Sequence, residues 1–242
     1  MDDGMIREIQ CEIGFVKEKI SKAAQKFGRD AESVRIIVVT KGQPLDVVDA
    51  AIHAGAKLLG ENYAEEAVEK INTLTNKSEV EWHMIGHVQS RKTNLIAMNF
   101  SMVHSVDSLK LANRLEESLR KTGTMMPVLL EFNTGGEETK YGWQANDPKT
   151  WDVVLPEIDQ IVGLTHLKVS GLMTMPPYND DPEKSRSYFK KLVKLRDHLA
   201  GYFKNTDLRE LSMGTSSDYE VAVEEGATYV RIGQAILGKR GY

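Results

Sequence analysis

Apolar residues recur along the chain in two alternating periods. Between Met5 and Phe27 they fall at helical spacing, and Gly28 follows where a helix would end. From there, short runs rich in β-branched residues alternate with longer segments of helical period. The pattern predicts strands over 35–40, 57–60, 82–85, 102–105, 127–132, 168–174, 210–213 and 229–232, and helices over 44–54, 63–74, 88–97, 108–121, 148–161, 182–203, 218–225 and 234–238.

Eight strands that alternate with helices are typical of a closed (β/α)8 barrel. A chain of 242 residues suits one such barrel, and no linker rich in Pro, Gly or Ser divides it. We therefore expect a single α/β domain over residues 1–242, a TIM-type barrel with an extra N-terminal helix, within 1–28, packed against it. A doubly wound open sheet is the main structural alternative. The longest irregular segment is 133–147, and long loops are usually functional or mobile.

Composition narrows the class of partner. The net charge is −4, with 41% hydrophobic and 27% charged residues, and acidic and basic residues are interspersed. This favours an ordinary globular protein and argues against nucleic acid or an anionic membrane as the main partner. A single cysteine, Cys11, allows no disulfide framework and fits a cytoplasmic compartment. The N-terminus does not have the pattern of a secretory signal, and no apolar run is long enough to cross a membrane.

Residues suited to a site collect at the predicted carboxyl ends of the strands, which form the active face of (β/α)8 enzymes. In chain order they are Lys41, Glu61, Asn62, His83, Gly86, His87, Ser105, Asn133, Met173, Met175, Gly214, Thr215, Ser216, Arg231 and Gly233. Lys41 shares a strand face with Ile37 and Val39, so we expect it to point into the barrel mouth. A partly desolvated lysine there can act as a nucleophile toward a carbonyl, although lysines at strand ends are more often simply solvated.

The loops after the last two strands, SMGTSSD and RIGQAILG, lie where such barrels most often hold phosphate. Gly214 and Gly233 permit close backbone approach, and Ser216 can donate a hydrogen bond to a phosphate oxygen. A Schiff-base lysine facing this cradle fits a phosphosugar, as in a lysine-dependent aldolase, or pyridoxal 5′-phosphate (PLP). Arg231 has the inward parity of Gly233, so it could bond a pyridine nitrogen or pair with a carboxylate such as Glu61.

The histidines suggest no metal site. His83 and His87 have no carboxylate or cysteine nearby that completes a ligand set with recognisable spacing, so we expect supporting or capping roles for both. The remaining histidines, His53, His104, His166 and His198, are scattered and carry no assigned chemistry. Met173 and Met175 are interpreted as packing at the barrel mouth.

Six segments of the chain, taken together, resemble the sequence motifs of one known protein family. They are VVTKGQP, LLGENYAEEAVEK, EWHMIGHVQSRKT, VHSVDSLKLA, GLMTMPP and LSMGTSSDYEVAVEEGATYVRIGQAILG. They resemble the pyridoxal phosphate homeostasis protein family, single-domain relatives of the N-terminal barrel of alanine racemase, and the resemblance covers essentially the whole chain. This sequence departs from the family pattern at Gly42-Gln43-Pro44, where many members have a Thr-Lys-Pro or similar sequence, and at Thr40, where Ser is common. The segment NTGGEETKYGW also differs slightly.

The resemblance implies that PLP is the cofactor and that Lys41 holds it as an internal aldimine. It implies that Ser216 and the backbone amides of Gly233 and Gln234 hold the phosphate, and that Arg231 lies near the pyridine nitrogen. It further implies that the cofactor pocket is lined by Asn62, His83, Met173 and Met213.

An arginine at the pyridine nitrogen disfavours protonation of the ring, which makes the cofactor a poorer electron sink. Racemisation also needs a second acid/base group, which alanine racemase takes from a C-terminal domain, and we expect none here because the chain ends at Tyr242. We therefore expect a protein that carries or buffers PLP, with little or no catalysis of its own, and so affects amino-acid and keto-acid balance. The alternatives are a low-activity amino-acid racemase and a phosphosugar lyase or isomerase. PLP-dependent apo-enzymes are the expected recipients, and a monomer or weak dimer the expected state.

Overall fold

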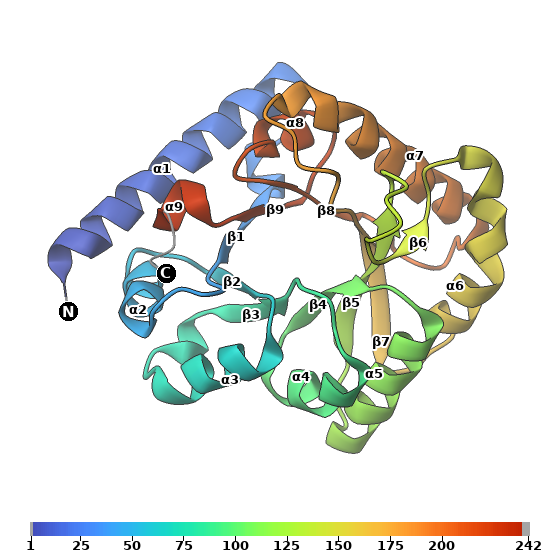
Figure 1. Ribbon diagram of the computed structural model, residues 1–242, viewed down its shortest axis with the longest axis horizontal. Coiled ribbons are helices and arrows are strands. Elements are labelled where there is room, and N and C mark those ends of the chain that lie inside the picture. Colours follow the sequence, from blue (N-terminus) through green and yellow to red (C-terminus); the bar gives the residue numbers. More distant parts are fainter. Residues whose placement is uncertain (1, 239–242) are drawn as a thin grey trace.

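A computed structural model describes residues 2–238 of the chain. Eight parallel strands form a closed ring with helices around it (Figure 1). Around the ring, the strands are β1 (Arg35–Val39), β2 (Leu58–Glu61), β3 (Glu81–Met84), β4 (Met102–Val106), β5 (Met126–Asn133), β7 (Leu167–Met173), β8 (Glu210–Thr215) and β9 (Tyr229–Ile232). Because β4 pairs with β5 and β9 pairs with β1, the sheet has no free edge within this ring. The predicted (β/α)8 barrel is confirmed, and the open-sheet alternative is wrong.

Helices follow the barrel strands and cover their outer faces (Figure 1). They are α2 (Leu45–His53), α3 (Ala64–Thr73), α4 (Thr93–Asn99), α5 (Leu109–Thr122), α6 (Leu155–Val162), α7 (Arg186–Tyr202), α8 (Tyr219–Glu224) and α9 (Gln234–Leu237). Three predicted helices begin instead as 3-10 turns, Ser90–Lys92, Pro148–Val154 and Pro182–Ser185. In the last two a proline occupies the first turn, where it lacks an N–H to donate, and Asp147 or Asp181 caps the turn.

The extra N-terminal helix is α1 (Asp3–Lys26), which Figure 1 shows along the outside of the barrel. The Asp2 carboxylate accepts hydrogen bonds from the first amides of the helix, which satisfies donors that have no partner inside it. Its apolar stripe, including Ile9, Ile13, Val16 and Ile20, is buried. Through this stripe α1 packs on α2, α8 and α9, and so covers the seam where β9 meets β1. No helix within residues 2–238 is both long and apolar enough to cross a bilayer.

The strands separate two apolar cores. A small cluster of Ile37, Met102, Leu129, Met173 and Tyr229 lies inside the barrel, whereas Val38 and most other apolar residues pack between the strands and the helices. Successive side chains point to opposite faces of a strand, so these clusters fix which residues of each strand can reach the barrel mouth. One short strand, β6 (Trp143–Gln144), was not predicted; it pairs with the end of β5 inside the long loop 133–147.

Candidate functional site

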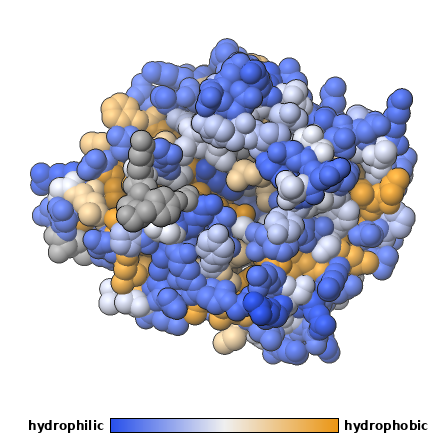
Figure 2. All heavy atoms as spheres, viewed as in Figure 1, coloured by the Kyte–Doolittle hydropathy of each residue, from blue (hydrophilic) through white to orange (hydrophobic). Residues whose placement is uncertain are grey.

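A cavity of about 470 Å³ lies at the carboxyl ends of β1, β2, β8 and β9. Cavities of this size are typical of small-molecule sites. Figure 2 shows that the face seen in Figure 1 is mostly hydrophilic and is hollowed near its centre. The residues that line the cavity are Val39, Lys41, Asn62, Ile85, Met175, Tyr178, Thr215, Ser216, Ser217, Arg231, Gly233, Gln234 and Ala235.

Lys41 lies in the turn just beyond the end of β1, and it is partly buried. The backbone on both sides of it is held by side chains of α3. Lys70 donates from Nζ to the Thr40 carbonyl at 2.7 Å, and the Gly42 amide donates to Glu66 Oε1 at 2.7 Å. Gly42 has φ +66°, a conformation that glycine adopts without strain. The departure from the family pattern at this position therefore suits the turn that carries Lys41.

Behind this turn lies a buried group of charges. Glu61 is fully buried and accepts from Lys70 Nζ at 2.9 Å and from the Thr40 hydroxyl at 2.7 Å. Lys70 also donates to Glu66 at 2.6 Å. Burial raises the pKa of Glu61, and the nearby Lys70 ammonium opposes that shift. Glu61 is therefore engaged on the outer side of the sheet, and the alternative in which it pairs with Arg231 is wrong.

The loops after β8 and β9 meet at Ser216. Its hydroxyl oxygen accepts from the Gly233 amide at 3.3 Å and from the Ala235 amide at 3.2 Å. Gly214, with φ +92°, packs so closely on the start of α8 that an added Cβ would lie 2.5 Å from the Ala222 Cβ. The two amides thus fix the Ser216 oxygen at one end of the cavity, and they leave its hydroxyl proton as a donor for an oxyanion.

Arg231 supplies a buried cation to the same cavity. Only 3% of its surface is exposed. Its Nη1 donates to Ser212 Oγ at 2.6 Å, and its Nη2 donates to the Thr174 carbonyl at 2.9 Å. Burial lowers the pKa of Arg231 to about 10, whereas Asp218 and Glu131 act in the opposite direction. Among the described residues, no carboxylate lies within ion-pair distance of it, so its direct hydrogen-bond partners are neutral, and Asp218 and Glu131 stabilise its charge from farther away.

A second cavity of about 570 Å³ adjoins the first and shares Asn62, Ile85, Met175 and Arg231 with it. Its wall includes Glu131, whose pKa is raised to about 7 by burial and by Asp107, with Arg231 acting against the shift. At its rim, the His87 ring stacks on Tyr141 with centroids 3.6 Å apart.

The structure brings most of the predicted site residues to the barrel mouth. Lys41, Asn62, Ser216, Arg231, Gly233 and Gln234 line the first cavity, and Met173 lines the second. Two predicted positions differ. Met213 is fully buried in the core between strands and helices, because Ser212 is the residue of β8 that faces inward, and its neighbours Leu211 and Met213 face the helices. His83 is buried inside the barrel, hydrogen-bonded to His104, and it lines neither cavity.

Sequence reasoning missed several residues at the mouth. Ser217 and Tyr178 line the first cavity, and Glu131 and Tyr141 line the second. Glu131 had a usable signal, because it is two residues from Leu129 on β5 and so shares its inward face. Tyr141 had none, since it lies in an irregular loop whose path no periodicity predicts.

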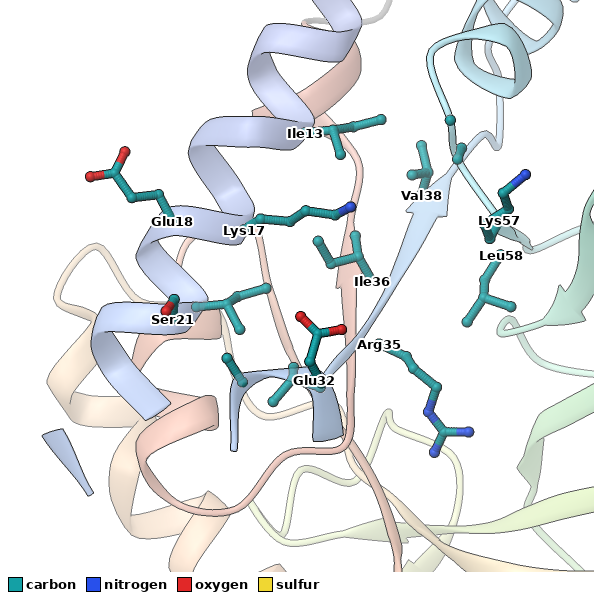
Figure 3. Close-up of a pocket in the computed structure, with 15 residues that line it drawn as sticks. Ile13, Lys17, Glu18, Ser21, Glu32, Arg35, Ile36, Val38, Lys57 and Leu58 are labelled. Carbon is teal, nitrogen blue, oxygen red and sulfur yellow. The ribbon is translucent and has the colours of Figure 1, made fainter. Parts of the chain in front are cut away.

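A third cavity, of about 550 Å³, lies between α1 and the amino-terminal parts of β1 and β2. Figure 3 shows Lys17 reaching across it from α1 toward β1, with Ile13, Ile36 and Val38 nearby. It contains none of the predicted site residues. Within residues 2–238, no group of three or more His, Cys, Asp or Glu side chains is arranged to hold a metal ion.

The fold and this residue set define a (β/α)8 barrel with a lysine at its mouth, just after the first strand. Comparison with known proteins supports this fold and identifies the family. Residues 16–241 match the family model described as alanine racemase, N-terminal domain. The pyridoxal phosphate homeostasis protein of Aquifex aeolicus is 38% identical over 233 residues, which cover 96% of this chain and 99% of that one.

Solved structures agree as well. PipY of Synechococcus elongatus with PLP bound has a TM-score of 0.77 at 30% identity, and the match covers 90% of this chain and all of that one. Alanine racemase of Clostridium difficile, at 15% identity, shares the fold with a TM-score of 0.71, over 95% of this chain and 59% of that one. The chain therefore belongs to the alanine racemase N-terminal domain family and, within it, to the pyridoxal phosphate homeostasis proteins.

Proposed function

We propose that this protein binds PLP at the barrel mouth and carries or buffers it within the cell. The observation that carries the proposal is that Lys41, the Ser216 group and Arg231 line one cavity of about 470 Å³. Relatives named pyridoxal phosphate homeostasis protein support it, as does the structure of PipY with PLP bound.

Each functional group of PLP has a suitable residue in this cavity. The amine of Lys41 suits the aldehyde: their condensation forms one C=N bond and releases one water, and hydrolysis reverses both changes. The Ser216 hydroxyl proton suits the phosphate, together with the amides of Gly233 and Gln234 in the adjoining loop, and the Gly233 and Ala235 amides hold the Ser216 oxygen in place. Arg231 can donate an N–H to the pyridine nitrogen. When bound, PLP supplies an electrophilic carbon and an aromatic ring that can delocalise charge.

The chemistry of Arg231 favours a protein that carries PLP rather than an enzyme that uses PLP to convert amino acids. A guanidinium donates hydrogen bonds and accepts none, so beside a ring nitrogen it opposes protonation of that nitrogen. With a pKa of about 10, lowered by burial, Arg231 is still a cation at neutral pH. A ring without that proton withdraws electrons weakly, which limits any reaction that passes through a carbanion.

We infer that the bound cofactor is handed to PLP-dependent apo-enzymes in the cytoplasm, by a monomer or weak dimer. An open mouth supports release, because Lys41 and Ser216 are only partly buried. Exposed aromatic side chains border the two cavities, among them Tyr178, 79% exposed, and Tyr63, 64% exposed. Such side chains are enriched where proteins contact partners.

A titration with a chirality assay tests the proposal. PLP added to the purified protein should produce a visible absorbance band with one equivalent bound, and the loaded protein should leave L-alanine and other L-amino acids unracemised. Lys41→Ala should lose the band, whereas Lys57→Ala, which changes an exposed lysine outside the mouth, should keep it. Rapid racemisation that disappears in Lys41→Ala would show that the racemase alternative is correct.

A further inference from the structure

Polar side chains inside the barrel form a continuous hydrogen-bonded chain that begins at Arg231. Arg231 Nη1 lies 2.6 Å from Ser212 Oγ, and Ser212 Oγ lies 2.9 Å from His104 Nδ1. His104 Nε2 in turn lies 3.0 Å from His83 Nδ1. His83 Nε2 then faces Glu81 Oε2 at 3.5 Å. The chain leads from the cavity toward the opposite end of the barrel, where β3 begins at Glu81.

The two ends of this chain set the direction of its hydrogen bonds. At one end, the Arg231 guanidinium can only donate, so the Ser212 oxygen accepts from it. At the other end, the Glu81 carboxylate can only accept, so the proton of a neutral His83 lies on Nε2, and its Nδ1 accepts from His104 Nε2. A neutral His104 then carries no proton on Nδ1, which accepts from the Ser212 hydroxyl.

Burial keeps the chain in that arrangement. Ser212 and His104 have no exposed surface, and His83 is 1% exposed. Burial lowers the pKa of His83 to about 4 and that of His104 well below its ordinary value, and Arg231 contributes to the second shift. Both imidazoles are therefore neutral at physiological pH, and Arg231 does not face a second cation.

The chain and two neighbouring acceptors restrain the guanidinium. Ser212 holds Nη1, while the Thr174 carbonyl and the Met175 sulfur hold Nη2 at 2.9 and 3.5 Å. A guanidinium has five N–H groups, so these contacts leave donors for a ligand. The orientation of those donors depends on Ser212, whose own hydroxyl is oriented by His104.

We propose that Ser212 and His104 are positioning residues that aim Arg231 at the ring nitrogen of PLP. The inference rests on the proposed function, because it needs PLP in the cavity. It assigns a role to a histidine to which the sequence pattern attaches no chemistry, and it explains why polar side chains occupy the interior of the barrel.

An analogue of PLP in which C–H replaces the ring nitrogen tests the proposal through binding alone. Wild-type protein should bind PLP about 10-fold or more tightly than the analogue, since a hydrogen bond to a charged donor has that worth. Ser212→Ala should reduce this preference to about threefold or less. Ser118→Ala, which removes a buried serine between α4 and α5, should retain the full preference.

A pair of changes at His104 distinguishes positioning from packing. His104→Asn keeps an acceptor near the position of Nδ1 and should retain the preference for PLP, whereas His104→Leu should lose it. Circular dichroism and thermal melting show whether each variant is folded. If Ser212→Ala does not fold, the two His104 variants test the positioning role on their own.

The outcomes separate the two proposals. If the wild-type protein binds neither PLP nor the analogue, the proposed function fails. If it binds both with equal affinity, or if folded Ser212→Ala and His104→Leu variants keep the wild-type preference, PLP binding stands and the positioning role is overturned.

Discussion

At the residue scale, Ser216 is the side chain that connects the loop after β8 to the loop after β9. Its oxygen accepts from two backbone amides, so its proton is available to a ligand in the cavity. A phosphate there gains a hydroxyl donor whose position the backbone of the next strand fixes. The neighbouring Ser217 also lines the cavity, but it is exposed, and its one side-chain hydrogen bond within residues 2–238 is to Thr215 Oγ1, at 3.3 Å.

Ser216→Ala should therefore weaken PLP binding, with Kd raised about 10- to 150-fold, the equivalent of about 1.5–3 kcal/mol for a hydrogen bond to a charged group. Ser217→Ala is the matched control and should change Kd by less than about threefold. Absorbance or fluorescence titration measures both. Equal effects of the two changes would remove Ser216 from the phosphate site.

Because of Glu131, we expect the free energy of unfolding of the PLP-free protein to depend on pH. Its pKa is raised from 4.5 to about 7 by burial, so the folded state prefers the neutral acid. This contribution is fully present below about pH 4.5 and is lost as pH rises through 7. Glu131→Gln should remove it, so that the variant gains about 1–3 kcal/mol over the wild type between pH 4.5 and 8.

Urea unfolding at several pH values measures that difference, because groups that titrate in both proteins cancel. Glu138→Gln, a change at an exposed position in the loop that follows β5, is the control and should follow the wild-type profile. A constant difference between wild type and Glu131→Gln across this pH range would contradict the raised pKa.

At the scale of elements, the end of β1 and the helix α3 act together. Lys70 reaches from α3 to the Thr40 carbonyl, to Glu61 and to Glu66, which itself holds the Gly42 amide. One helix therefore fixes the backbone on both sides of Lys41. We infer that α3 limits the freedom of the lysine that is to meet the aldehyde.

Lys70→Met should destabilise the protein by about 3–5 kcal/mol, because it leaves the Glu61 carboxylate buried without its cation. Lys22→Met breaks the exposed pair with Glu18 and should leave the free energy of unfolding nearly unchanged, because solvent screens an exposed pair. Urea unfolding gives both values. The double variant Glu61→Gln with Lys70→Met should recover part of the loss, and a loss for Lys70→Met no greater than for Lys22→Met would contradict this account.

Periodicity predicted the eight barrel strands and the helices between them, because one face of each element is buried in a regular core. It placed Lys41 and Arg231 correctly at the mouth, since alternation along a strand decides which residues face inward. The same rule, applied to β8, assigns Met213 to the outer core. Contacts between distant strands, such as His104 with Ser212, leave no periodic signal, and neither does the two-residue strand β6.

At the scale of the whole molecule, closure of the barrel assembles the site. Pairing of β1 with β9 brings Lys41 near Gly233, although the two are far apart in the chain. The helix α1 packs over this seam against α2, α8 and α9. The turn after the first strand and the last strand itself thus contribute the lysine and the arginine to one cavity, which is the arrangement that covalent binding of PLP at Lys41 requires.

Borohydride reduction followed by peptide mass analysis shows whether Lys41 is the residue that binds PLP covalently. Protein loaded with PLP, reduced and digested should carry one pyridoxyl phosphate group, on the peptide that contains Lys41. Lys41→Ala should lose this label, and Lys57→Ala should retain it. A label on a different lysine of the wild-type protein, or no label at all after reduction, would contradict the account.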